Sequence, residues 1–161
     1  MKERFVDVVT SVGEAADVAH ETLTLLDAAR DAAHKAYAPY SRFRVGAAAL
    51  LDNGEVVAGS NQENAAYPSG LCAERVAVFY ANSRFPDAKI LRLLIYAETD
   101  KGPVLTPIAP CGACRQVLLE KESAQGSPIS VSLAGAAELY TVHSVERLLP
   151  LSFLPKSLEG D

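Results

Sequence analysis

The segment RVGAAALLDNGEVVAGS, residues 44–60, limits the possible folds more than any other part of the sequence. Its two apolar runs, residues 45–51 and 56–60, are separated by Asp-Asn-Gly at positions 52–54. An Asn-Gly pair readily adopts the positive φ angles that a tight hairpin turn requires. The segment is therefore predicted to be an antiparallel hairpin.

Helical and strand patterns alternate along the rest of the chain. Apolar residues recur every three or four positions in LTLLDAARDAAHKAY, residues 23–37, as they do on one buried face of a helix. Further elements are expected as helices that begin near Cys72 and Cys111, a short helix at 144–150, and strands at 89–98, 129–134 and 139–142. Strands that are separated by crossover helices imply a layered α/β domain whose sheet is partly parallel.

Length and composition favour one ordinary domain that spans residues 1–161. Apolar residues make up 49% and charged residues 22% of the chain, which is typical of a globular protein. The net charge of −5 and the lack of a Lys/Arg run argue against nucleic acid as a partner. No segment approaches the ~20 apolar residues of a membrane span, and the first residues do not resemble a signal peptide. We therefore expect a cytoplasmic protein without a membrane partner.

All three cysteines fall in two short segments, LCAER at 71–75 and PCGACR at 110–115. Cys111 and Cys114 have the two-residue separation that lets two thiolates reach one ion from the first turn of a helix, and Cys72 can supply a third. Three sulfurs suit zinc best, and neither segment contains a further cysteine or a histidine as a fourth ligand. An open ligand position predicts one catalytic zinc ion per chain.

Two residues beside Cys72 suit work at such a metal. Glu74 is two positions further along, so on a helix its side chain points in a different direction and is not expected to bind the same ion. A carboxylate there can take a proton from water and pass it to a leaving group. Three thiolates around Zn²⁺ leave a net charge of −1, and a guanidinium from Arg75 that donates to the sulfurs would offset part of it.

Each of these residues also has a simpler explanation. The CxxC could be a redox pair or two buried small residues, Cys72 could be a packed core residue, and Glu74 and Arg75 could be exposed helix charges. A structural zinc module or a redox interaction module would use the same thiols. Such a module would give Glu74 no role, and the zinc module would need a fourth ligand. The combination, at two loop-to-helix junctions that follow predicted strands, favours a catalytic site.

CAE followed by PCxxC resembles the signature of the zinc deaminases, in which zinc-activated water attacks the carbon that bears the amine. More narrowly, YSRFRVGAAAL, GSNQENAAYPSGLCAER, PCGACRQVL and LLPLSFLP, in this order, resemble the small homo-tetrameric cytidine deaminases. The resemblance covers about residues 36–154. It implies a three-layer α/β/α domain with a mixed sheet of about five strands. It also implies hydrolytic deamination of cytidine and 2′-deoxycytidine in pyrimidine salvage, with Glu74 transferring protons to N3 and then to the amine.

The same resemblance implies five contacts to a nucleoside. Asn61 and Glu63 match an N-x-E pair that binds the ribose 3′-hydroxyl, and an amide and a carboxylate are suitable partners for a hydroxyl. Phe43 matches a residue that packs on the pyrimidine ring. Ala73 would offer its backbone amide to the 2-oxo group. Phe153 matches an aromatic residue that reaches the site of a neighbouring subunit.

The two ends of the chain are less strongly determined. Residues 1–30 form an N-terminal extension or a helix, and the sequence does not decide between them. Most of this segment lies outside the part of the chain that carries the resemblance. Residues 151–161 form an apolar tail that we expect at a subunit interface of a tetramer; the alternative is a tail that folds back onto its own subunit.

Gln62 stands where the family usually has an aliphatic residue. An alternative substrate is another cytosine compound, such as an aminoacylnucleoside antibiotic, but Asn61 and Glu63 suit an unmodified ribose.

Overall fold

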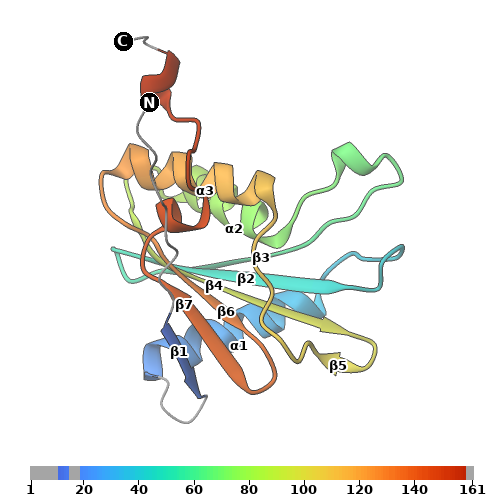
Figure 1. Ribbon diagram of the computed structural model, residues 1–161. Helices are drawn as coiled ribbons and strands as arrows, with labels where there is room; N and C mark the ends of the chain where they lie inside the picture. Colours follow the sequence, from blue (N-terminus) through green and yellow to red (C-terminus); the bar gives the residue numbers. More distant parts are fainter. Residues whose placement is uncertain (1–10, 15–18, 159–161) are drawn as a thin grey trace, which may run out of the picture.

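The computed structural model describes residues 11–14 and 19–158, and it has three layers, helix on sheet on helix (Figure 1). Helix α1 (His20–His34) covers one face of a mixed sheet, and helices α2 (Ala73–Arg84) and α3 (Gly112–Gln125) cover the other. The strands are β1 (Ser11–Glu14), β2 (Arg44–Leu51), β3 (Val56–Ser60), β4 (Ile90–Thr99), β5 (Gly102–Pro103), β6 (Ser130–Ala134) and β7 (Glu138–Val142). The α/β/α fold expected from the sequence is confirmed.

The sheet contains more strands than the five or so that were expected. Its order is β1-β7-β6-β4-β2-β3, and β5 pairs with β4, which makes seven strands. The two additional strands, β1 and β5, are four and two residues long, too short to show an alternating pattern in the sequence. Strands β4 and β6 are parallel and are connected through α3, and the other pairs within the described ranges are antiparallel.

The predicted hairpin is confirmed, although its turn differs from the expected one. Strands β2 and β3 pair from Gly46 opposite Ser60 to Leu50 opposite Val56. Gly54 has a φ of 85°, whereas Asn53 does not enter the left-handed region. Instead, the Asn53 side chain accepts a hydrogen bond from the Glu55 amide at 3.0 Å, which is a usual role for asparagine in turns.

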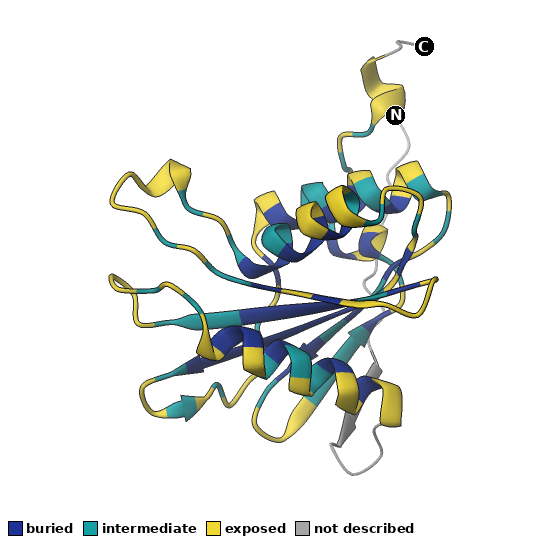
Figure 2. Cartoon of the chain, turned by 180° about the vertical axis from the view of Figure 1, so that it is seen from behind, coloured by how far each residue is buried: buried dark blue, intermediate teal, exposed yellow. Residues whose placement is uncertain are grey.

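Small residues bring the helices close to the sheet. A Cβ atom on Gly46 would lie 1.8 Å from the carbonyl oxygen of Ala29 in α1, and one on Gly59 would lie 2.5 Å from the amide nitrogen of Ala77 in α2. Both contacts are with backbone atoms, so a side chain at either glycine would force the helix away. Figure 2 shows buried residues along the sheet-facing sides of the helices. This packing fixes the position of the α2 N-terminus.

The remaining elements agree with the predicted ones to within a few residues. Helix α1 ends at His34, three residues before its predicted end, because Tyr37 pairs through its backbone with the loop at 61–63. The predicted helix at 144–150 is a 3₁₀-helix, η3 (Val145–Leu148), and two other 3₁₀-helices are η2 (Tyr67–Ser69) and η4 (Pro155–Leu158). The open prediction for residues 1–30 lies partly outside the described residues. In the described part of the chain, no helix combines the length and the apolar character needed to cross a lipid bilayer.

Candidate active site

The three thiols meet where α2 and α3 begin. Cys72 and Cys111 have extended backbones and are the N-cap residues of α2 and α3, and Cys114 lies in the first turn of α3. Their Sγ atoms all lie within 4.8 Å of one another, and those of Cys72 and Cys111 are 3.8 Å apart. Two helix N-termini, each with a partial positive charge, therefore face one cluster of sulfur atoms.

The cluster fits a zinc ion. Tetrahedral ligands at a Zn–S distance of about 2.3 Å lie ~3.8 Å from one another, which matches the separation of the Cys72 and Cys111 sulfurs. Arg75 extends its Nη2 atom to within 3.9 Å of the Cys72 Sγ. Its buried Nε atom has no hydrogen-bond partner among the described residues, as expected for a cation that serves a site of negative charge.

The cluster distributes its protons unevenly. The pKa of Cys72 is lowered to about 5, chiefly because Cys114 donates a hydrogen bond to its sulfur; Arg75 lowers it further, while burial opposes the shift. The pKa of Cys114 is raised because its thiol gives that hydrogen bond and because it is buried. Negative charge is therefore placed on Cys72, beside the guanidinium. A metal ion that binds all three sulfurs must displace the other protons.

Glu74 and Ala73 occupy the first turn of α2, directly after the Cys72 ligand. The Glu74 side chain is buried, with only 4% of the residue exposed. Burial raises its pKa, and the negative charge on Cys72 adds to this effect. Ala73 is fully buried and is the first residue of the helix, where a backbone N–H has no partner within the helix.

An open pocket of about 450 Å³ lies beside the thiols. Its wall is formed by residues 40–41, 61–64, 67 and 70–72, together with Arg75. Asn61 and Glu63, predicted from the sequence to bind ribose, are therefore brought into one cavity with Cys72 and Arg75. Phe43 and Glu74 lie next to this wall rather than in it.

Hydrogen bonds to the backbone hold Glu63 in place. Its Oε2 atom accepts from the amides of Tyr40 at 2.9 Å and Ser41 at 3.2 Å, and no described residue donates to its Oε1 atom. Hydrogen bonds from Ser41, then from the Tyr40 amide, lower the pKa of Glu63 against a smaller opposing effect of burial. The pocket thus has an ionised carboxylate with one oxygen available to a ligand.

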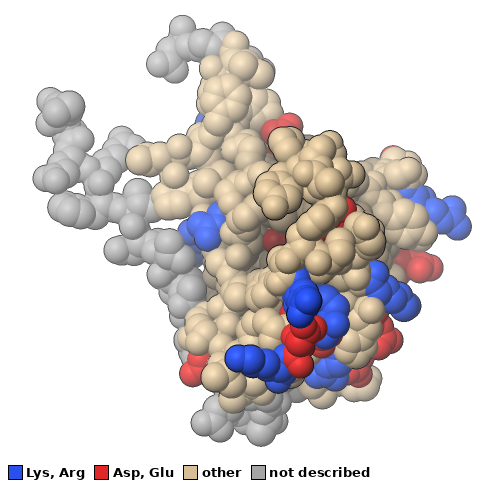
Figure 3. Space-filling model, turned by 90° about the vertical axis from the view of Figure 1, so that its right-hand side faces the viewer, with Lys and Arg blue, Asp and Glu red and all other residues tan. Residues whose placement is uncertain are grey.

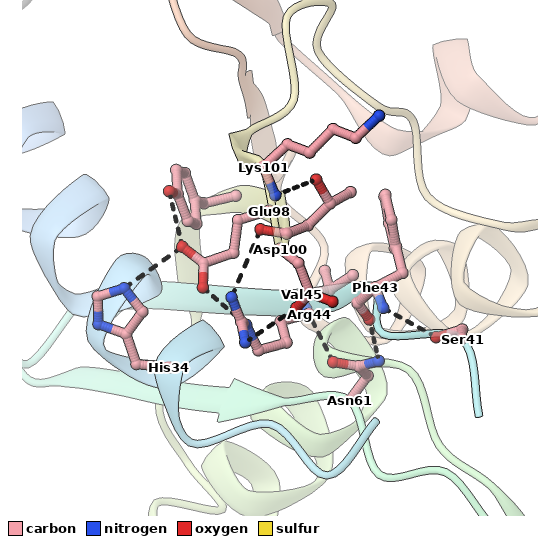
Figure 4. A network of polar contacts seen from close by, with 11 residues as sticks. His34, Ser41, Phe43, Arg44, Val45, Asn61, Glu98, Asp100 and Lys101 are labelled. Carbon is pink, nitrogen blue, oxygen red and sulfur yellow. Dashed lines mark hydrogen bonds and ion pairs between the residues drawn. The ribbon is translucent and has the colours of Figure 1, made fainter. Parts of the chain in front are cut away.

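Asn61 connects the pocket to the start of β2. Its Nδ2 donates to the Phe43 carbonyl at 2.9 Å, and its Oδ1 accepts from the Val45 amide at 2.8 Å. Figure 4 shows these bonds on either side of Arg44. Each of the two amide atoms retains the capacity for one more hydrogen bond, which a ligand hydroxyl can use. Phe43 is half-buried and is held through its own backbone.

Phe153 lies away from this pocket. Its carbonyl accepts a hydrogen bond from Gln116 of α3 at 2.9 Å, and its ring lies in a shallow hollow beside Phe79 and Val117 on the outer side of α2 and α3. The residue is 58% exposed. Within a single chain, the structure therefore does not bring Phe153 to the thiols.

Several residues of the pocket were not expected from the sequence. Tyr40 and Tyr67 form an edge-to-face pair with ring centroids 6.3 Å apart in the pocket wall, and Ser41 contributes a backbone amide. Arg115 donates to the carbonyls of Pro110 at 2.8 Å and Leu148 at 3.0 Å, so it fixes the loop before Cys111. Backbone groups take part in most of these contacts, so the residue types in the sequence could not predict them.

The molecular surface on this side is of mixed character. In Figure 3, Lys and Arg side chains lie among Asp and Glu side chains on the lower part of the face, and the part above them is mostly uncharged. Two ion pairs, Arg42–Asp100 and Arg44–Asp100, have N–O distances of 3.9 and 3.8 Å. No single sign of charge dominates the face that Figure 3 shows.

Comparison with known proteins identifies relatives whose sequences resemble most of this chain. Residues 19–125 match the family described as the cytidine and deoxycytidylate deaminase zinc-binding region. The cytidine deaminase of Halalkalibacterium halodurans is 39% identical over 134 residues, 83% of this chain and 95% of the relative. The cytidine deaminase of Sporosarcina psychrophila is 38% identical and covers 83% and 92%.

Solved structures agree with these sequence relatives. The crystal structure of cytidine deaminase from Burkholderia pseudomallei matches with a TM-score of 0.68 and 38% identity, over 84% of this chain and all of that one. That of cytidine deaminase from Mycobacterium tuberculosis matches with a TM-score of 0.65 and 36% identity, over 83% and 97%. The fold of this chain is therefore shared with proteins of one named activity.

Proposed function

From the premise that this chain belongs to the cytidine deaminase family of zinc enzymes, we propose that it converts cytidine and 2′-deoxycytidine to uridine and 2′-deoxyuridine with release of ammonia, as a step of pyrimidine salvage. One observation carries this proposal: three clustered thiols and the buried Glu74 lie beside a pocket that presents Asn61 and Glu63. Thiol ligands stay reduced in the cytoplasm, where we place the enzyme.

Cys72, Cys111 and Cys114 would hold the zinc ion. Zinc that is bound by three protein ligands acts as a Lewis acid and lowers the pKa of water towards ~7. Arg75 lies 3.9 Å from the Cys72 sulfur and reduces the negative charge of the thiolate set. The residue thereby helps the metal to keep its acidity.

Glu74 would carry the protons of the reaction. Deamination breaks the C4–N bond of cytosine and forms a C4–O bond, so protons from water must reach N3 and the leaving amine. Glu74 lies in the first turn of α2 and is shielded from solvent, which supports a role as a carboxyl group that would act on the reacting water without competition from bulk water.

The remaining residues would bind the nucleoside. Asn61 and the available oxygen of Glu63 can hydrogen-bond the ribose 3′-hydroxyl, and the Ala73 amide can donate to the 2-oxo group. Phe43 would pack against the pyrimidine. Binding of the sugar would then help to orient C4 for attack, because contacts far from the reacting atom can contribute to catalysis.

The charges of the pocket favour a nucleoside over a nucleotide. Glu63 is ionised and repels a phosphate, and the one cation in the described pocket wall, Arg75, is directed at Cys72. The same residues suit an unmodified ribose, so an aminoacylnucleoside remains a less suitable substrate. We expect turnover of cytidine and 2′-deoxycytidine and much weaker turnover of deoxycytidylate.

A homo-tetramer would complete the sites. Leu151, Phe153 and Leu158 in the tail are 97%, 58% and 76% exposed, and an exposed apolar segment on a small protein usually marks an interface. Contacts within the chain are few: Gln116 binds the Phe153 carbonyl, and Leu154 packs on the core. The exposure of these three side chains supports a tail that reaches a neighbouring subunit. Apolar segments of this kind are commonly buried by assembly into a closed symmetric oligomer.

Two experiments test this function. Purified protein with zinc should lower the absorbance of cytidine and of 2′-deoxycytidine, and no turnover of either would refute the proposal. Light scattering should give about four times the chain mass of 17.1 kDa. A chain truncated after Pro150 should lose both the tetramer and most of its turnover. A truncated monomer with full activity would show that each site needs no neighbour.

A further inference from the structure

Glu98 is a buried carboxylate on the side of the sheet away from the thiols. Only 6% of the residue is exposed. Its Oε1 accepts from Arg44 Nε at 2.8 Å, and its Oε2 lies 3.1 Å from the Tyr96 hydroxyl and 3.3 Å from His34 Nε2. Tyr96 packs with residues of α1, which places the whole group on the α1 face of β2 and β4 (Figure 4).

A buried ion pair is weak evidence for stability, because desolvation of both charges offsets most of their attraction. Arg44 and Glu98 are direct cross-strand partners in the β2–β4 register. Arg44 Nη1 also lies 3.8 Å from Asp100, and its Nη2 donates to the Thr99 carbonyl at 3.5 Å. Such a set of directional contacts holds the first residue of β2 in one place, which apolar packing would do less specifically.

The residues on either side of Arg44 hold Asn61, which lines the pocket. Asn61 binds the Phe43 carbonyl and the Val45 amide, so its side chain spans the backbone of Arg44 from the side of β2 that faces β3. The Phe43 amide donates to Ser41 Oγ at 3.0 Å. The position of Asn61 and the direction of Phe43 therefore both depend on where Arg44 is held.

We propose that the Arg44–Glu98 ion pair is a positioning pair for the reaction, which sets Phe43 and Asn61 for the nucleoside from behind the sheet. The inference rests on the proposed function, in which these two residues contact the base and the ribose. Arg44 and Glu98 touch no substrate themselves. Loss of the pair should displace both contacts together and weaken nucleoside binding.

The test compares three variants. Arg44→Met removes the guanidinium from the buried Glu98, which keeps His34 as a neighbour, and is expected to lower the melting temperature. Glu98→Gln keeps the shape and can still accept from Tyr96. In Arg44→Met/Glu98→Gln, no unpaired charge remains, so stability should recover relative to Arg44→Met. We expect the cytidine KM to stay about tenfold above wild type in the double variant, with kcat changed by less than about threefold and one zinc per chain.

Arg92→Met is the matched control. Arg92 lies on the same strand as Glu98, at the other end, and its pair with Glu21 at 3.1 Å lies on the same α1 side of the sheet. Its loss should change the melting temperature but leave KM unaltered. Partial unfolding lowers the amount of active enzyme and hence apparent kcat, whereas it leaves KM unchanged, so a selective rise in KM identifies positioning.

The outcomes separate the two proposals. If Phe43→Ala raises KM while the double variant keeps the wild-type KM, the pair is only structural and this inference fails, but the proposed function stands. If Arg92→Met raises KM as much as the double variant does, the effect is general and the inference also fails. If Phe43→Ala leaves KM unchanged, the proposed base contact is wrong and the inference fails with it.

Discussion

The two ends of the pocket are built in different ways. At the thiol end, Cys72, Cys111 and Cys114 come from the first residues of two helices, and helix geometry sets their spacing. At the nucleoside end, Asn61 and Glu63 lie in an irregular loop, and backbone groups of residues 40–45 hold their side chains. Under the proposed function, the chemistry would depend on a few side chains whose identity is essential, whereas selection of the substrate would depend on hydrogen bonds that connect three segments.

Removal of a thiol should have the largest effect. Cys114 is fully buried, and Cys114→Ala leaves two sulfurs, too few to hold zinc in a three-ligand site. We expect no stoichiometric zinc in metal analysis and no measurable turnover of cytidine. Circular dichroism should show that the secondary structure is retained. Full zinc content and activity in this variant would remove Cys114 from the site.

Glu74→Gln should separate chemistry from metal binding at the same end. The amide can still form hydrogen bonds but cannot carry a proton, and general acid–base groups contribute about 10²–10⁴-fold. We therefore expect kcat to fall by at least about 10²-fold, with one zinc per chain and an unchanged fold. Activity close to that of the wild type would give Glu74 another role.

Glu63→Ala tests the nucleoside end, and its effect on turnover should depend on the presence of the ribose. Loss of a charged hydrogen bond costs about 1.5–3 kcal/mol, so kcat/KM for cytidine should fall roughly 10- to 100-fold. Free cytosine has no ribose, so we expect it to be a poor substrate of the wild type and to be affected little by this substitution. Glu55→Ala, which removes an exposed carboxylate in the hairpin loop, is the control. An equal loss for cytidine and cytosine would contradict a ribose contact.

The smallest expected effect is a pH dependence of stability at Glu63. Its pKa in the folded protein lies below the ordinary value of 4.5, chiefly because the ionised form interacts with the Ser41 side chain and also because it accepts hydrogen bonds from the amides of Tyr40 and Ser41. Its charge therefore stabilises the fold above that pH, and the effect is lost as the pH falls through the folded pKa. The difference in melting temperature between wild type and Glu63→Gln should shrink on acidification from pH 7 to below about 4. If the difference in melting temperature grew on acidification, the pKa of Glu63 would be raised in the folded protein, not lowered.

The two segments of the thiol end could be predicted from the sequence because the information in each is local. CAE and CxxC place their residues within single helical turns, and the surrounding strands and helices show clear periodicity. The nucleoside end was reached through a resemblance, since spacing alone carries no signal for Asn61 or Phe43. The support of Glu63 by the amides of Tyr40 and Ser41 could not be foreseen, because any residue type offers a backbone amide.

By itself, the sequence determined the alternation of helices and strands, the hairpin at 44–60, the Cys111–Cys114 pair and the placement of Glu74 beside Cys72, because each depends on residues that are near in the chain. The meeting of Cys72 with Cys111, 39 residues away, was decided by the tertiary structure. Only the tertiary structure decided that Arg44 meets Glu98 across two strands, that β1 and β5 extend the sheet, and that Phe153 lies away from the thiols of its own chain. These features depend on contacts between residues far apart in sequence, whose partners the packing of helices on the sheet selects.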